Sequence, residues 1–130
     1  MEFSTIWAPR ILSVLRIVDG LILLQYGTAK LFGWPAVEIF ENLKWLSLFG
    51  IAGMFELVGG TLLILGLFTR PVAFILSGEM AAAYFIEHFP ESFFPLLNGG
   101  TLAIILCFAC LYLAAAGGGP LSLDATMERK

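Results

Sequence analysis

Two glutamates inside apolar segments are the side chains of this sequence best placed to do chemistry. Glu56 and Glu79 each lie in a long apolar run, and the two runs meet at Thr69-Arg70-Pro71. A carboxylate in such a run is costly to bury, so it is expected either to pair with a cation or to serve in proton transfer. If Glu79, near the middle of its run, has no cation beside it, it could carry a proton, because burial disfavours the charged form.

The first apolar run carries a stripe of polar and small residues. At about 100° per residue, these residues cover about a third of a helix circumference, and we expect the stripe to face the inside of a helix bundle and to meet Glu56 or Glu79 there. Two interpretations stay open: a structural network in which Arg16 pairs with Asp19 and Lys30 reaches the interface, or a site that uses the charges in chemistry. The stripe consists of Arg16, Asp19, Gly20, Tyr26, Gly27 and Lys30.

The one histidine, His88, follows Glu87 at the end of the third apolar run. An imidazole titrates near neutral pH, so His88 is either a proton-transfer group or a polar cap at the membrane interface. No metal site is expected, because the sequence has no local spacing of His, Cys, Asp or Glu that is typical of metal ligands.

Cys107 and Cys110 form a C-x-x-C pattern inside the fourth apolar run. Apolar burial disfavours a reactive thiolate, so we interpret the two cysteines as small packing residues. Thiol–quinone exchange is the weaker alternative, because the chain offers no second cysteine pair to relay electrons.

The composition indicates which elements must position these side chains. The chain has 130 residues, of which 59% are hydrophobic and 13% charged, whereas a soluble domain averages about 45–50% apolar and about 25% charged residues. We therefore predict an all-α fold, a single integral membrane four-helix bundle over residues 1–130. The helices are expected at about residues 11–32, 48–68, 71–89 and 96–116, each close to the roughly 20 residues that cross a bilayer.

Charge and connecting segments suggest how the bundle is placed. Lys and Arg are more frequent at the end that carries the termini, with Arg10 and Arg70, than at the opposite end, with Lys44, so both termini are predicted in the cytoplasm. Residues 38–44 are expected to form a short amphipathic piece at the surface. The net charge of −3, without a basic cluster, argues against nucleic acid as a partner, and the first five residues do not resemble a removable signal peptide.

Several glycine-containing motifs recur in the order and spacing of one known family. They are G-x-x-K-L-F-G at 27–33, E-L-V-G-G at 56–60, L-G-L-F-T-R at 65–70, G-E-M-A-A-A-Y-F at 78–85, F-F-P at 93–95, N-G-G at 98–100 and G-G-G-P at 117–120. In these motifs the chain resembles the DoxX family of small four-helix integral membrane proteins over about residues 10–124. One departure is Thr101, which stands where the family often has a glutamate after N-G-G.

The resemblance implies a bacterial cytoplasmic (inner) membrane protein in contact with quinone and with a larger complex, because relatives include a small subunit of a thiosulfate:quinone oxidoreductase. The first hypothesis is a membrane subunit of a quinone-linked oxidoreductase system, with no intrinsic cofactor and with electrons from a redox partner protein or from the substrate. The alternative is a non-catalytic membrane scaffold or anchor whose buried charges are structural pairs; either protein could form a homo-oligomer. Under the first hypothesis Glu79, Glu56 and His88 move protons, Lys30, Tyr26 and Tyr84 contact the quinone, and Arg16 and Asp19 form a structural polar network.

Overall fold

The computed structural model describes residues 2–128, and within this range the chain is helical with no strand. Its four long helices are α1 (Glu2–Phe32), α2 (Leu48–Leu65), α3 (Thr69–Ala83) and α5 (Thr101–Ala116). The predicted all-α class is confirmed. Shorter pieces connect and follow the long helices: the 3₁₀ turn η1 (Glu38–Phe40), the π-helical η2 (Tyr84–His88), the 3₁₀ turn η3 (Phe89–Glu91), α4 (Pro95–Asn98) and α6 (Leu123–Glu128).

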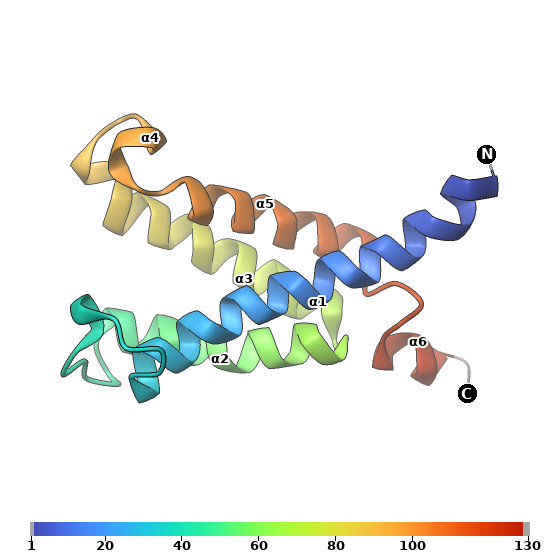
Figure 1. Ribbon diagram of the computed structural model, residues 1–130, viewed down its shortest axis with the longest axis horizontal. Helices are drawn as coiled ribbons and strands as arrows, with labels where there is room; N and C mark the ends of the chain where they lie inside the picture. The colour runs from blue at the N-terminus through green and yellow to red at the C-terminus, as the bar shows by residue number, and fades with distance from the viewer. Residues whose placement is uncertain (1, 129–130) are drawn as a thin grey trace.

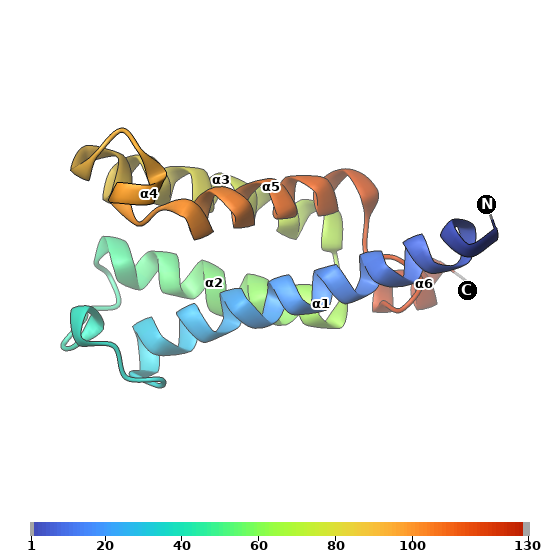
Figure 2. The same cartoon turned by 45° about the horizontal axis from the view of Figure 1, so that its top comes forward.

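The long helices pack in two layers. Figure 2 shows α1 alongside α2 in one layer and α3 alongside α5 in the other, and α2 also contacts α3. The beginning of α1 and the short helix α6 lie at the same end of the molecule, whereas η1 and α4 lie at the opposite end (Figure 1). We call these the terminal end and the distal end.

Two helix boundaries differ from the sequence prediction. The first helix begins at Glu2 rather than near residue 11, and it continues through Pro9. Residues 2–10 are exposed, so the apolar run marked where α1 enters the packed bundle and not where its hydrogen bonding begins. The fourth predicted helix is divided at Gly99, whose φ of 73° ends α4 before α5 begins at Thr101. Residues 38–44 contain only the single turn η1 of the expected surface helix.

Two helical stretches of the described chain, Leu48–Leu65 and Thr69–Glu91, are long and apolar enough to cross a membrane. The helix α5 is apolar but has 16 residues, and α1 is long but carries charged residues within its apolar run. Large apolar side chains cover the outside of the bundle, among them Phe74, Phe85 and Phe108, which are each more than 60% exposed. Such a surface suits lipid better than water.

Glycines allow the backbones of α1 and α2 to touch. A β-carbon at Gly27 of α1 would lie 2.5 Å from the backbone nitrogen of Leu57, and one at Gly60 of α2 would lie 2.7 Å from that of Leu24. Small residues bring membrane helices together in this way. This close contact brings the charged face of α1 against the carboxylate on α2.

We expect Gly27→Ala to lower the free energy of unfolding by about 1–3 kcal/mol, because the added methyl group forces the two helices apart. The matched control is Gly78→Ala on α3, where an added β-carbon meets no atom within 4 Å. Alanine is the better helix former, so the control should be neutral or more stable by up to about 1 kcal/mol. Thermal unfolding in detergent compares the two variants, and equal effects would show that α1 and α2 are not in close contact.

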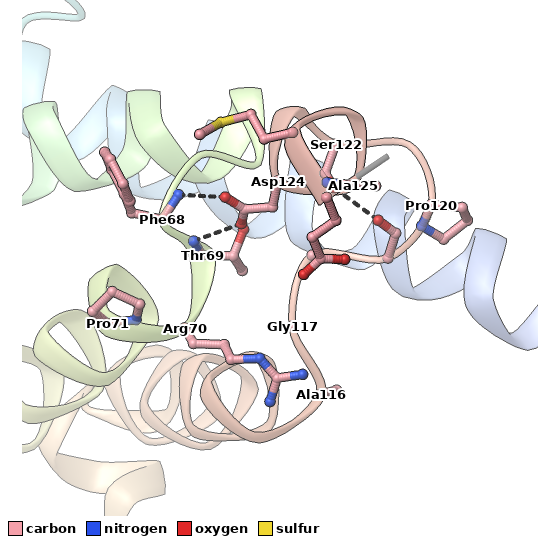
Figure 3. Close-up of a pocket in the computed structure, with 14 residues that line it drawn as sticks. Phe68, Thr69, Arg70, Pro71, Ala116, Gly117, Pro120, Ser122, Asp124 and Ala125 are labelled. Atoms are coloured by element: carbon pink, nitrogen blue, oxygen red, sulfur yellow. Dashed lines mark hydrogen bonds between the residues drawn. The ribbon is translucent and has the colours of Figure 1, made fainter. Parts of the chain in front are cut away.

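At the terminal end, the Asp124 side chain caps the first turn of α3. Its two carboxylate oxygens accept hydrogen bonds from the backbone nitrogens of Phe68 and Thr69, at 2.8 and 2.9 Å (Figure 3). Its own backbone nitrogen donates to the carbonyl of Gly66 at 2.9 Å. Burial acts to raise the pKa of Asp124, but the hydrogen bonds from Thr69 and Phe68 and the nearby Arg16 guanidinium outweigh it, and the pKa is lowered.

Because the pKa of Asp124 is lower in the folded chain than in the unfolded chain, its contribution to stability is complete above the ordinary aspartate pKa of about 3.9 and is lost as the pH falls through the folded value. Asp124→Asn should therefore cost about 0.5–2 kcal/mol at pH 7 and little in strong acid. Thermal unfolding at both pH values tests this, with Glu91→Gln in η3 as an exposed control. A cost for Asp124→Asn that does not change with pH would contradict the assignment.

Candidate functional site

A buried ion pair joins α1 and α2 toward the distal end. The ammonium of Lys30, in the last turn of α1, lies 2.9 and 3.1 Å from the two carboxylate oxygens of Glu56, in the middle of α2. The side chains are 8% and 1% exposed. The expected pairing of Glu56 with a cation of the first helix is confirmed. Gly53, one turn before Glu56, makes room for it, because a β-carbon there would lie 2.9 Å from that of Lys30.

Three aromatic rings surround the Lys30 ammonium. It lies 5.9 Å from the ring centre of Tyr26, 5.5 Å from that of Phe40 and 5.9 Å from that of Phe49. Aromatic faces attract a cation at these distances. The three rings and the Glu56 carboxylate therefore contact the ammonium from different elements. Neither Phe40 nor Phe49 was predicted from the sequence. Phe40 lies in residues 38–44, which were interpreted as a surface piece, and Phe49 is one of many apolar residues in α2.

A cavity of about 340 Å³ opens beside the ion pair, between α1, α2, the end of α3 and α5. Its volume is within the usual range of small-molecule sites, about 300–1,000 Å³. Most of its lining is apolar, from Leu23, Ile39, Phe40, Phe49, Met80, Ala83, Leu102, Ala103 and Leu106. The polar side chains that line it are Tyr26, Lys30, Glu56, Glu87 and His88.

His88 is positioned by the π-helical turn η2 and by Asn98. Its Nδ1 lies 3.0 Å from the backbone carbonyl of Asn98. A carbonyl only accepts, so Nδ1 carries the hydrogen in the neutral ring and Nε2 is the acceptor. The buried Asn98 amide also donates to the hydroxyl of Tyr84 and to the carbonyl of Ser92, at 3.0 and 2.9 Å. Single π-helical turns are frequent at functional sites.

Two of the sequence candidates lie outside this cavity. Tyr84 does not line it, and its hydroxyl is engaged by Asn98. Glu79 lies in a separate groove between α2 and α3, although its carboxyl group is beside that of Glu56. The structure therefore brings Lys30, Glu56, Tyr26 and His88 together around one cavity, adds Glu87, and places Glu79 behind Glu56.

Arg16 and Asp19 do not form the ion pair that one of the two interpretations of the stripe contained. Arg16 is 1% exposed and donates hydrogen bonds to backbone carbonyls of Leu63 at 2.7 Å, Leu121 at 2.8 Å and Gly118. The five N–H groups of a guanidinium allow one side chain to reach several carbonyls at once, here at the end of α2 and in the segment after α5. Asp19 instead accepts a hydrogen bond from the Cys110 thiol at 3.1 Å.

Cys110 is fully buried, and both cysteines are free thiols. In residues 2–128 no three His, Cys, Asp or Glu side chains converge in a way that could hold a metal ion.

The model of the DoxX family matches residues 11–89, which include Lys30, Glu56, Glu79 and His88. An uncharacterized protein of Haemophilus influenzae is 41% identical over 128 residues, covering 95% of this chain and 96% of the relative. No solved structure matches the chain. From the family match over more than half of its length, the chain belongs to the DoxX family of membrane proteins.

Proposed function

We propose that this chain is an inner-membrane subunit of a quinone-linked oxidoreductase system and that the cavity beside Lys30 holds the quinone ring. The observation that carries the proposal is the composition of the cavity, whose mainly apolar wall contains one buried ammonium and one imidazole. An apolar ring with two carbonyl oxygens needs such a wall and a few polar partners.

In this proposal each polar side chain has a distinct role. Lys30, held by Glu56 and the aromatic rings, donates a hydrogen bond to a carbonyl oxygen of the ligand. His88 accepts or returns a proton through Nε2, because Nδ1 is bound to the carbonyl of Asn98. Glu87 lines the same cavity and is the second proton acceptor. A bound quinone would supply the redox chemistry, and a redox partner or its substrate would supply the electrons.

We also propose that all four long helices cross the bilayer with both termini in the cytoplasm. Arg10 and Arg70 at the terminal end, against Lys44 at the distal end, support this orientation. The shortness of α5 is compatible with a span, because α4 and the segment after Ala116 extend it at both ends. The cavity then lies toward the periplasmic half of the membrane, open to lipid-soluble ligands.

The test is purification from the native host in a gentle detergent, followed by mass spectrometry of bound lipids and proteins. The proposal predicts a co-purifying quinone or a stoichiometric redox partner. The matched control is Lys30→Met/Glu56→Met, which removes both charges of the pair and should lose the quinone. A wild-type homo-oligomer that carries neither quinone nor redox partner would contradict the proposal.

A structural role is the second candidate, because the Lys30–Glu56 pair is satisfied within the chain. Both oxygens of Glu56 contact the ammonium, and three rings surround it. In a scaffold or anchor, these residues would only have to hold α1 and α2 together. In that case the double variant would keep every protein partner of the wild type.

A further inference from the structure

Two hollows of the bundle meet at the end of α3. The cavity beside Lys30 lies on one side, and a groove of about 290 Å³ between α2 and α3 lies on the other. Ala83 and Glu87 line both hollows. The groove is otherwise apolar on its rim, with exposed side chains such as Phe55 and Ile75. Its two carboxyl groups are those of Glu79 and Glu87.

Glu79 lies beside Glu56 with its hydrogen bonding incomplete. The two carboxyl groups are close enough for one to hydrogen-bond the other. Both oxygens of Glu56 already accept from Lys30, whereas Oε1 of Glu79 is buried without a partner. Ionised carboxylates only accept hydrogen bonds, so two of them side by side offer no donor to each other and repel.

One cation balances one carboxylate. Lys30 is the cation at the pair, and it is bound to Glu56. The part of α5 that lines the cavity is apolar, contributing Leu102, Ala103 and Leu106. The ionisable groups near Glu79 or the adjoining cavity are Tyr26 and Lys30 from α1, Glu56 from α2, Glu87 and His88 from the continuation of α3, and the Cys110 thiol from α5.

We propose that Glu79 carries a proton at neutral pH and forms with Glu56 a carboxyl pair that holds one exchangeable proton between the groove and the cavity. The proton gives the two adjacent carboxyl groups the hydrogen-bond donor that neither has when both are ionised. When it moves, the O–H bond at Glu79 breaks and one forms at Glu56, and Lys30 remains an ammonium that now balances Glu79. No electron is transferred.

Glu79 is then a proton reserve and not a ligand contact, since it lies outside the cavity lining. Its use in quinone chemistry, where it would resupply Glu87 or His88, rests on the proposed function. The protonated pair itself follows from the arrangement of three side chains, and it can be tested without any quinone.

Infrared spectroscopy of the purified full-length protein in lipid at neutral pH tests the pair. A protonated carboxyl group gives a C=O stretching band that is separate from the carboxylate and amide bands and shifts in D2O. Glu79→Gln should remove one such component. Asp19→Asn is the control, because Asp19 is also buried with an unpartnered oxygen, and it should leave that component in place. A spectrum that Glu79→Gln does not change would overturn the proposal.

Glu56→Gln gives an independent result. It leaves Lys30 without its carboxylate, so Glu79 becomes the partner of the ammonium and should lose its proton. The component assigned to Glu79 is then expected to disappear although Glu79 is still present. Persistence of this component in Glu56→Gln would show that Glu79 does not share a proton with the Lys30–Glu56 pair. Both variants are nearly isosteric, and unchanged circular dichroism verifies that they fold. If the spectra behave as expected but no quinone is ever bound, the carboxyl pair stands and the proposed function fails.

Discussion

Lys30→Met is expected to destabilise the protein by about 3–5 kcal/mol, because it leaves Glu56 buried without its cation. The double variant Lys30→Met/Glu56→Met should recover most of this loss, since a buried ion pair is often replaced by apolar side chains at little cost. Unfolding in mixed detergent and SDS micelles, followed by circular dichroism, measures both. A single variant as stable as the wild type would show that the pair is not formed in the membrane protein.

The double variant also separates stability from function. If the charges serve a ligand, the recovered protein is folded but has lost ligand binding. If the charges serve packing alone, the double variant should regain both its stability and the function of the wild type. Glu56 is 1% exposed, so its replacement does not change the surface that a protein partner would contact.

Arg16→Met is the second change with a large expected effect. It would remove the hydrogen bonds that a buried guanidinium donates to the carbonyls of Leu63, Gly118 and Leu121, and a hydrogen bond to a charged group contributes about 1.5–3 kcal/mol. We expect a loss of at least about 3 kcal/mol. Arg10→Met is the matched control, because Arg10 is exposed and only stacks over Trp7 at 5.2 Å.

The control should change stability by less than about 0.5 kcal/mol. Arg16 joins three segments that are far apart in the sequence, so its loss should also free the segment after α5. Limited proteolysis near Gly118 measures this directly. Equal proteolysis of the Arg16→Met and Arg10→Met variants would contradict the role assigned to Arg16.

The sequence allowed the charged face of α1 to be predicted because that face depends only on helical periodicity. Arg16, Asp19, Gly20, Gly27 and Lys30 are all buried, as expected from one stripe. The expectation that Glu56 pairs with a cation of α1 came from the cost of burying an unpaired carboxylate, but the sequence did not show that this cation is Lys30. These two arguments use local geometry and charge alone.

Contacts that depend on tertiary structure could not be predicted in the same way. Arg16 binds a carbonyl 102 residues further along the chain, and no local pattern reveals which carbonyls are left free there. The site of Glu79, outside the cavity, depends on how α3 is rotated against α2. The role of Asn98 depends on the π-helical turn that brings His88 toward it. In the sequence, Asn98 was noted only as part of the N-G-G motif at 98–100 and not as a partner of His88.

Equilibrium titration of the purified protein with a short-chain quinone in lipid nanodiscs tests the quinone site beside Lys30 directly. The wild type should bind the quinone saturably, and the folded Lys30→Met/Glu56→Met variant should not bind it. Gly78→Ala, a change outside the cavity lining, should bind as the wild type does. Absence of binding to the wild type, or equal binding to the double variant, would contradict a quinone site beside Lys30.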